Sequence, residues 1–341
     1  MPDNYSQFEQ RKQDHINLAL NSTNQASEMN VLDMVFLRHE ALPDLNFSEL
    51  SITSYRFGRV VEKPFLVSSM TAGHKDALKI NRHLVAACAQ TGWAMGVGSQ
   101  RRELTDPEAA FEWQPLKRDF QGVSLFGNLG ISQLINTPLR DIERLTESLE
   151  SEALIIHCNA LQEVIQPEGT PQFKGCWQVL EQIVKISTVP VVVKETGCGF
   201  STNTLIRLNE IGVAAVDVSG LGGTHWGRIE GQRNPADSLL HRAALTFRNW
   251  GVDTVQSVKN AVQLAPSYEV WGSGGVRHGL DAARLLALGV SMVGFAKPML
   301  EAALQGTEAV IELMQTIEYE LKIALFCTGS RSLADLKGKV C

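Results

Sequence analysis

The residue with the clearest chemical use is a lysine that closes an apolar run. Lys194 directly follows three valines, Val191–Val193. In a site without water a lysine must be paired or lose its proton, so Lys194 is suited to form a Schiff base or to hydrogen-bond an acceptor on a cofactor. A strand-end lysine that reaches solvent is the alternative. Glu195 would point to the other side of a strand, and we expect it in packing or a salt bridge, outside the site.

A second group of reactive side chains shares one segment after an apolar run. His157, Asn159, Gln162 and Glu163 lie close together in the sequence. A histidine and a carboxylate can transfer protons. A glutamate that shares Mg²⁺ with a substrate diphosphate also fits a metal that takes oxygen ligands and keeps several waters. The alternative for Glu163 is a first-turn residue that the helix dipole stabilises.

Two glycine-rich segments are suited to a phosphate group. They are Gly272–Arg277 and Gly294–Lys297. Glycine lets backbone N–H groups approach a phosphate, and the start of a following helix favours its negative charge. Glycines that only make tight turns are the alternative. Two such segments, with Ser273 and Arg277 beside them, favour a phosphate site.

Positive charge gathers near the amino terminus. Arg11, Lys12 and His15 lie in an otherwise acidic chain, and on a helix Arg11 and His15 would share one face. Taken alone, this stretch is typical of a solvated charged arm. Together with the glycine segments it is also suited to cover a phosphorylated ligand.

These groups need a framework that brings them together, and eight apolar runs supply it. The runs alternate with helix-like segments and are continuous, as expected for parallel strands buried on both faces. This pattern predicts an α/β fold, a (β/α)8 TIM barrel, in which polar residues at the strand ends converge on one rim. An open doubly wound sheet is the alternative. The expected strands are Phe65–Val67, Ala94–Val97, Val123–Phe126, Ala153–Ile156, Val191–Val193, Ala214–Val218, Glu269–Trp271 and Met292–Gly294.

The segments around this repeat complete the predicted organisation. Residues 1–60 fall outside it and are expected to form an arm that caps the barrel, and residues 61–341 form the barrel itself. The segment 219–251 is longer than one connection needs, which is typical of functional or mobile loops. The helices expected are Leu78–Gln90, Leu139–Glu150, Gly175–Ile186, Thr202–Ile211, Asp253–Leu264, Leu280–Leu288 and Thr307–Leu325.

Composition excludes several classes of protein. The 341 residues carry a net charge of -6, which disfavours nucleic acid as a partner. No apolar run approaches the roughly 20 residues of a membrane span. The six cysteines show no metal-binding spacing, and no secretory signal is recognisable. We therefore expect a cytoplasmic protein with reduced thiols.

Several segments together resemble one enzyme family. The segments RKQDH, MTAGH, GSQR, FGNLG, HCNALQE, VKETGCGFS, DVSGLGGTHW and SGGVRHGLDAARLLALGVSMVGFAKP occur in this order between Arg11 and Leu300. This order is similar to that of the type 2 isopentenyl-diphosphate isomerases, and the amino-terminal RK with the HxNxxQE segment is its most specific part. The chain departs from the pattern at Ala72, where a glycine is common; Cys158 and Ala160 occupy variable positions.

The resemblance implies a set of ligands and site residues. It implies a barrel that binds FMN and needs it reduced, commonly by NADPH, that uses Mg²⁺ on Glu163, and that assembles into tetramers or larger homo-oligomers. The positions that match flavin contacts are Ser69, Met70, Thr71, Ser99, Asn128, Lys194, Ser219, Thr224, Gly275, Val276, Arg277, Ala296 and Lys297. Those that match substrate contacts are Arg11, Lys12, Ser99, Gln100, Arg101, His157, Asn159 and Gln162.

The reaction that the resemblance implies is the interconversion of isopentenyl and dimethylallyl diphosphate in isoprenoid biosynthesis. It adds one proton and removes another without net redox change, and reduced flavin would be the main acid–base group, through its nitrogen 5. Gln162 and His157 are the catalytic candidates: Gln162 would position the alkene or assist proton movement, and His157 would help to hold the diphosphate. Anionic flavin would favour a cationic transition state.

Two other functions compete with this one. An FMN-dependent 2-hydroxy-acid oxidoreductase would need a histidine base, and His225 is available for that role. A flavin barrel without activity that serves as a scaffold would have lost its reactive groups. Lys194, Gln162 and Glu163 are all present, which argues against the scaffold.

Overall fold

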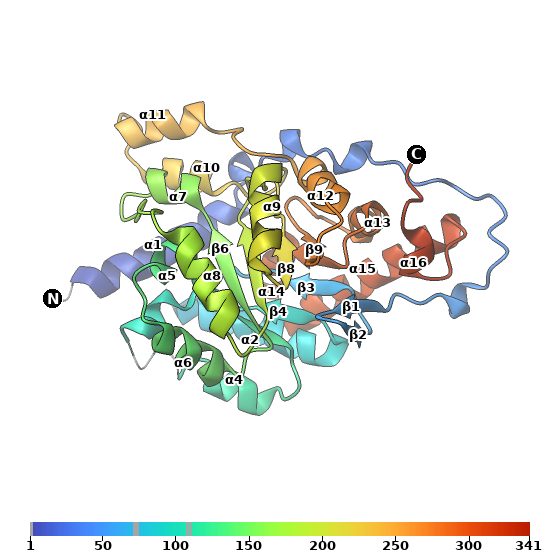
Figure 1. The fold of residues 1–341 in the computed structure, drawn as a ribbon, viewed down its shortest axis with the longest axis horizontal. Coiled ribbons are helices and arrows are strands. Elements are labelled where there is room, and N and C mark those ends of the chain that lie inside the picture. The colour runs from blue at the N-terminus through green and yellow to red at the C-terminus, as the bar shows by residue number, and fades with distance from the viewer. Residues whose placement is uncertain (1–2, 71–74, 107–108, 110) are drawn as a thin grey trace.

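A closed parallel barrel forms the centre of the molecule. The computed structural model describes residues 3–70, 75–106, 109 and 111–341. Its strands are hydrogen-bonded in the order β10-β3-β4-β5-β6-β7-β8-β9, so the ring closes between the last strand and the first (Figure 1). The predicted (β/α)8 barrel is confirmed, and the open sheet is wrong. The strands are β3 (Phe65–Val67), β4 (Ala94–Gly96), β5 (Leu125–Gly130), β6 (Ala153–Cys158), β7 (Val191–Glu195), β8 (Ala215–Asp217), β9 (Glu269–Gly272) and β10 (Met292–Phe295).

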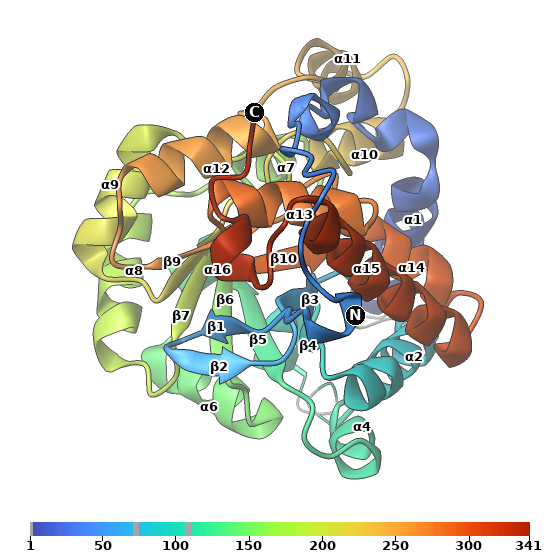
Figure 2. The same ribbon diagram turned by 90° about the vertical axis from the view of Figure 1, so that its right-hand side faces the viewer.

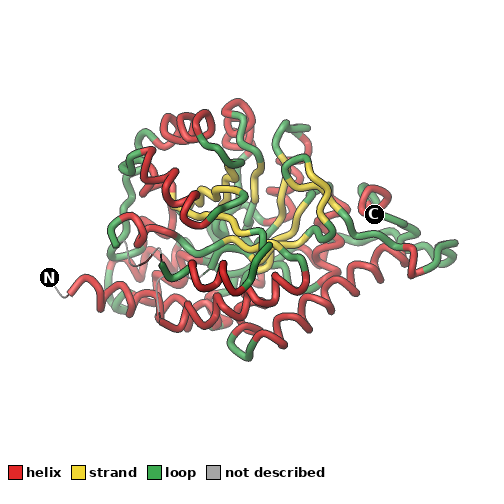
Figure 3. Tube along the Cα trace, turned by 90° about the horizontal axis from the view of Figure 1, so that it is seen from below, coloured by secondary structure: helices red, strands yellow, loops and turns green. Residues whose placement is uncertain are grey.

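Helices surround the strands on the outside, as the tube view shows (Figure 3). Their ends follow local capping chemistry: Ser201 and Asp253 accept backbone N–H bonds at the starts of α9 and α12, and Gly212 ends α9 in a left-handed conformation. All the helices expected from the sequence are present. They are α2 (Lys75–Thr91), α6 (Leu139–Leu149), α8 (Cys176–Ile186), α9 (Thr202–Ile211), α12 (Thr254–Gln263), α13 (Gly279–Leu288) and α15 (Thr307–Cys327).

Shorter helices fill the loops between these elements. They include α10 and α11, which lie within the long segment 219–251, where the sequence predicts no helix. No described helix has the length and apolar character needed to cross a bilayer. The additional helices are α4 (Gln114–Asp119), α5 (Ile131–Leu134), α7 (Ala160–Ile165), α10 (Trp226–Arg233), α11 (Leu239–Thr246), α14 (Lys297–Ala303) and α16 (Leu333–Leu336).

Side chains that alternate along the strands fill the barrel interior. Leu66 contributes to a small inner cluster with Phe126 and Trp271, whereas its neighbours Phe65 and Val67 belong to the larger core around it. Phe57 packs against this inner cluster at the amino-terminal end of the barrel. Polar residues are therefore left to gather at the opposite, carboxyl-terminal end.

The first 61 residues run from one end of the barrel to the other. Helix α1 (Asp3–Leu20) lies beside α10 and α14. The chain then forms the 3-10 turns η1 (Ser22–Asn24), η2 (Ser27–Met29), η3 (Leu32–Met34) and η4 (Phe47–Glu49), and a hairpin of β1 (Ser54–Arg56) and β2 (Arg59–Val61). Figure 2 shows this hairpin across the end of the barrel opposite α1. The arm thus contributes to both ends of the barrel.

Candidate active site

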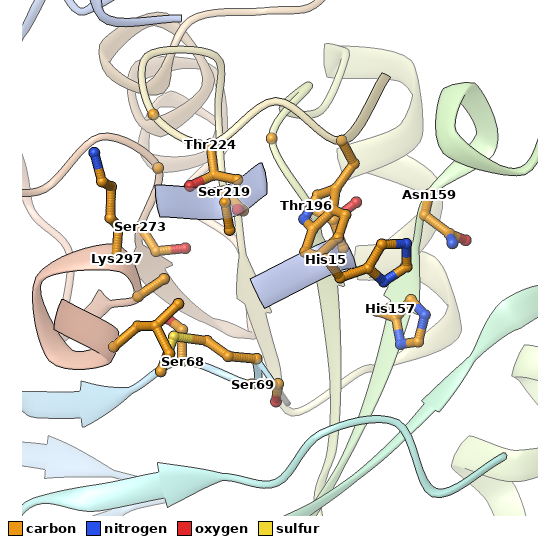
Figure 4. Close-up of a pocket in the computed structure, with 18 of the residues that line it drawn as sticks. His15, Ser68, Ser69, His157, Asn159, Thr196, Ser219, Thr224, Ser273 and Lys297 are labelled. Atoms are coloured by element: carbon orange, nitrogen blue, oxygen red, sulfur yellow. The ribbon is translucent and has the colours of Figure 1, made fainter. Parts of the chain in front are cut away.

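One cavity of about 530 Å³ lies at the carboxyl ends of the strands, beneath α1. Its volume is typical of a cofactor or substrate site. Figure 4 shows that side chains from the arm, β3, β6 and the loops after β7, β8 and β9 face a common space. The predicted site residues that line it are Arg11, Lys12, Ser69, Met70, Ser99, Arg101, Asn128, His157, Asn159, Gln162, Glu163, Lys194, Ser219, Thr224, Gly275, Val276, Arg277, Ala296 and Lys297.

The remaining two predicted site residues are Thr71 and Gln100. Thr71, like Ala72, is outside the described residues. Gln100 is not among the residues that line the cavity, because its side chain turns into the protein. Its amide oxygen accepts the backbone N–H of Asn128 at 3.0 Å, and its nitrogen donates to Glu103 at 3.1 Å. In the structure Gln100 therefore fixes Asn128, which does line the cavity.

Lys194 is paired inside the protein. Its Nζ donates to Asp217 Oδ2 at 2.6 Å and to Ser273 Oγ at 2.9 Å, and Ser273 donates to Asp217 Oδ1 at 2.6 Å. All three side chains are buried. An ammonium group has three donors, so this ring of bonds leaves one for a ligand in the cavity. The sequence does not single out Asp217, although it follows the apolar residues Ala214–Val216 as Lys194 follows its three valines.

Three glycines form a tight cradle beside this ring. A Cβ on Gly223 would lie 2.5 Å from the backbone of Gly275, and one on Gly274 would lie 2.3 Å from the carbonyl oxygen of Gly220. Gly274 and Gly275 also have positive φ. Ser219, nearby on the same cavity wall, has a φ of 34°, a strained value that is frequent at ligand sites. The glycines are needed for close backbone contact between the loops after β8 and β9.

Two buried hydroxyl groups in the cavity wall have no partner among the described residues. They are Ser68 Oγ and Ser69 Oγ, which lie just after β3. Buried polar groups are usually satisfied, because leaving one unpaired costs about 1–3 kcal/mol. Both hydroxyls are therefore placed to bond a ligand.

A buried carboxylate joins the arm to the segment that carries Gln162. Glu230 on α10 accepts hydrogen bonds from His15 Nε2 at 2.8 Å, Gln162 Nε2 at 3.1 Å and Arg233 at 2.7 Å. Burial alone would raise the pKa of Glu230, but the bonds from His15 and Arg233 lower it overall. The sequence does not single out Glu230, although the length of the segment 219–251 is typical of functional or mobile loops.

His157 is neutral at physiological pH. Burial, together with the charges of Lys12 and Lys194, lowers its pKa to about 4. Its Nδ1 lies 2.7 Å from Asn128 Oδ1. An amide oxygen only accepts, so Nδ1 carries the proton and Nε2 is unprotonated. His157 can donate to an anion at Nε2 only after it takes up a second proton.

Glu163 is buried and both its oxygens accept hydrogen bonds. Asn159 donates to Oε1 at 3.0 Å, and the backbone N–H of Thr170 donates to Oε2 at 2.6 Å. The amide oxygen of Asn159 has no protein partner. Within the described ranges, no three His, Cys, Asp or Glu side chains lie close enough to hold a metal by themselves.

Cations converge where α1 meets the cavity. Burial, and then the charge of Arg101, lower the pKa of Arg11. Burial, and then the charge of Arg11, lower the pKa of Lys12 to about 7. Both shifts show that positive charge is crowded and desolvated at this place. An anionic ligand would stabilise the charged forms of both side chains and so raise both pKa values.

Arg277 and His225 both form hydrogen bonds with nearby protein groups. Arg277 lines the cavity, but its guanidinium donates to Asp33 at 2.6 Å and to Asp281 at 2.8 Å. His225 is not part of the cavity lining. Its ring caps α10 by accepting the backbone N–H of Arg228. His225 is therefore not placed to act as the histidine base that a 2-hydroxy-acid oxidoreductase would need.

Comparisons with known proteins agree with this geometry. The FMN-dependent dehydrogenase family model matches residues 132–341. The isopentenyl-diphosphate delta-isomerase of Legionella pneumophila (strain Corby) is 67% identical over 341 residues, 100% of each chain. That of Bdellovibrio bacteriovorus is 51% identical over 343 residues, 99% of each chain. That of Cronobacter sakazakii is 38% identical over 333 residues, 97% of this chain and 96% of the other.

Solved structures of lower identity share the fold. A mutant flavocytochrome b2 with benzoylformate has a TM-score of 0.71 at 20% identity and covers 98% of this chain and 83% of its own. Mandelate oxidase with (S)-2-phenylpropionate has a TM-score of 0.67 at 18% identity, with 99% and 97% covered. At this identity the likeness concerns the barrel alone. By sequence, the chain belongs to the FMN-dependent (type 2) isopentenyl-diphosphate delta-isomerase family.

Proposed function

We propose that this protein interconverts isopentenyl diphosphate and dimethylallyl diphosphate with the help of reduced FMN. The observation that carries the proposal is a single cavity with two kinds of wall. Glycine loops, unpaired serine hydroxyls and Lys194 form one part, and Arg11, Lys12 and Arg101 form another. The first part suits a flavin with its phosphate, and the second suits a diphosphate.

The residues present fit FMN. Ser68 and Ser69 offer unpaired hydroxyls, Lys194 offers one remaining N–H, and the cradle of Gly223, Gly274 and Gly275 exposes backbone near a phosphate. A Cβ at any of these glycines would meet backbone atoms. Bound FMN in its reduced form would supply the group that gives and takes protons.

The chain's own residues would hold and orient the substrate. Arg11, Lys12 and Arg101 neutralise the diphosphate. Gln162 is fixed by three bonds: its amide nitrogen donates to Glu230 at 3.1 Å and to Gln166 at 3.4 Å, and its oxygen accepts from Asn159 at 3.2 Å. A side chain held in this way presents one orientation to the alkene and costs little further ordering when the substrate binds. Helix α1 contributes one side of the cavity, through residues that include Arg11, Lys12 and His15.

A magnesium ion fits if it is shared with the substrate. Glu163 and the unpaired amide oxygen of Asn159 are oxygen ligands of the kind that Mg²⁺ prefers. They are too few for a site made of protein alone, so the diphosphate and waters would complete the shell.

The proposal has four further parts. NADPH would be the reductant, and the protein would be cytoplasmic. It would form a tetramer or larger homo-oligomer, and it would divide into an arm (1–60) and a barrel (61–341).

The direct test is anaerobic incubation of the purified protein with isopentenyl diphosphate, FMN, NADPH and Mg²⁺. We expect dimethylallyl diphosphate to form, and none to form when FMN is left out. Absorbance of the oxidised flavin distinguishes the rival oxidoreductase, because a 2-hydroxy acid alone would bleach it in that case. Bleaching by the hydroxy acid without isomerisation would overturn the proposal.

Glu163→Gln should act mainly through magnesium. The change keeps the size of the side chain but removes its charge, and a charge-assisted contact is stronger than a neutral one by about 1.4 kcal/mol. The variant should bind FMN normally and need roughly tenfold more Mg²⁺ for half-maximal rate. Thr170→Val is the matched control, because it removes one bond to Glu163 and leaves the carboxylate. An equal change in the Mg²⁺ requirement of both variants would show that Glu163 only holds its loop in place.

Lys12 should make diphosphate binding depend on pH. With a pKa of about 7, Lys12 is largely neutral at pH 8 in the free protein, and a bound diphosphate would raise its pKa. Binding at pH 8 should therefore take up close to one proton at this residue, and at pH 6 almost none. Calorimetric titration in two buffers of different ionisation enthalpy measures this uptake. Lys12→Arg stays charged and should take up about one proton less at pH 8; identical uptake in both proteins would contradict the assignment.

A further inference from the structure

The loop after β9 packs closely against a neighbouring loop. Gly275 has a φ of 76°, and a Cβ there would lie 2.5 Å from the carbonyl oxygen of Gly222. The loop therefore lies directly against the loop that follows β8. Contacts with the neighbouring segments therefore support the conformation of this loop.

The amino-terminal arm contributes one of these neighbours. Asn30 Nδ2 donates to the carbonyl oxygen of Gly275 at 2.8 Å, and Asn30 Oδ1 accepts the backbone N–H of Leu32 at 3.0 Å. The second bond fixes the amide so that its nitrogen faces the loop. Asn30 also lines the cavity.

A second contact joins the same two segments. Asp33 lies one turn further along the arm and accepts two hydrogen bonds from Arg277, at 2.6 and 2.9 Å. Close approach on the other side requires Gly222, because a Cβ there would lie 3.3 Å from Asn30 Cα. The stretch Gly275–Arg277 is thus held at both ends by the arm.

The direction of these bonds determines what the loop offers to a ligand. The carbonyl of Gly275 is turned toward Asn30 and is satisfied there, so it does not present negative charge to the cavity. Gly274, Gly275 and Val276 line the cavity, and the two glycines let the backbone there approach a phosphate closely. The backbone N–H groups of Arg277 and Gly279, which follow, are already bonded to Asp281 and Glu320. Contact with a phosphate would therefore be made before α13 (Gly279–Leu288) begins.

We infer that Asn30 is a positioning residue for the phosphate of FMN, which it serves by holding the carbonyl of Gly275 away from the cavity. The inference rests on the proposed use of FMN. Asn30 acts through the loop and stabilises only the part of the site that meets the phosphate. It should therefore matter for FMN and not for riboflavin, which has the same ring system and no phosphate.

The test compares both flavins on the full-length apoprotein by quenching of flavin fluorescence. Asn30→Ala should weaken FMN binding about tenfold, the effect of losing one well-formed hydrogen bond to a loop near charge, and leave riboflavin binding within twofold. Asn30→Asp keeps the acceptor for Leu32 and loses the donor to Gly275, so it should weaken FMN binding at least as much. Asn46→Ala removes an arm amide that bonds Glu49, and it should change neither flavin.

The outcomes separate this inference from the proposed function. If the parent protein binds no FMN, the proposed function fails. If the parent binds FMN and Asn30→Ala leaves its affinity unchanged, or weakens FMN and riboflavin by the same factor, the inference fails. Circular dichroism checks folding, and Asn30→Asp provides the same comparison if the alanine variant does not fold.

Discussion

Asp217→Ala should lower the free energy of unfolding of the apoprotein by about 3–5 kcal/mol, the effect of removing one partner from a buried ion pair. The pair with Lys194 spans 2.6 Å, and the side chains of the two residues are 7% and 2% exposed. Its removal leaves an ammonium group in a wall where only Ser273 remains as a partner. Urea denaturation at pH 7, followed by far-ultraviolet circular dichroism, measures the change.

The matched control for this prediction is Ser273→Ala. It removes the bonds that Ser273 makes with Lys194 and Asp217 but leaves the ion pair in place. Its expected cost is about 1–3 kcal/mol, that of partners left short of a hydrogen bond. A cost for Asp217→Ala no larger than that for Ser273→Ala would show that the ion pair contributes little at this position.

Arg11→Ala should weaken binding of isopentenyl diphosphate to the flavin-loaded protein by roughly ten- to a hundredfold, since a charge-assisted contact contributes about 1.5–3 kcal/mol. Arg11 lies on α1, where it is crowded by Arg101. The loops around Gly275 lie on a different wall of the cavity. FMN affinity should therefore change less than twofold, and parallel titrations with the two ligands measure the difference.

Arg144→Ala serves as the control for net charge. Arg144 is 60% exposed and pairs with Asp141 on α6, outside the cavity lining. It should leave both affinities unchanged. Equal losses of FMN and diphosphate in Arg11→Ala would show that α1 supports the whole cavity and does not contact the diphosphate.

The sequence predicted the barrel well because its strands are continuous apolar runs. The sequence did not predict α10 or the β1–β2 hairpin, because neither has a recognisable pattern. Helix α10, with the sequence WGRIEGQR, contains two glycines and little apolar periodicity; its packing against α1, α7 and α11 stabilises it. The hairpin strands have three residues each, too few for an alternating pattern to be recognised.

Site residues were predictable as strand ends, but their pairings were not. Lys194 and Asp217 lie on adjacent strands, in register with each other, and nothing in either run indicates that one needs the other. His15 and Glu230 are 215 positions apart, so only the folded chain brings them together. Gln100 shows a finer limit: its neighbours Ser99 and Arg101 line the cavity, whereas its own side chain turns inward. The direction of such a side chain depends on the backbone angles of one residue, which the sequence does not show.

The route of the arm also has a consequence for the order in which the molecule assembles. Leu37 forms a bridge with Val340, the backbone N–H of Arg38 bonds Lys339, and β3 pairs with β10. Contacts of such long sequence separation form late, because a long stretch of chain must first be closed. During synthesis the part of the arm around Leu37 can therefore settle only after the segment around Val340 has been made.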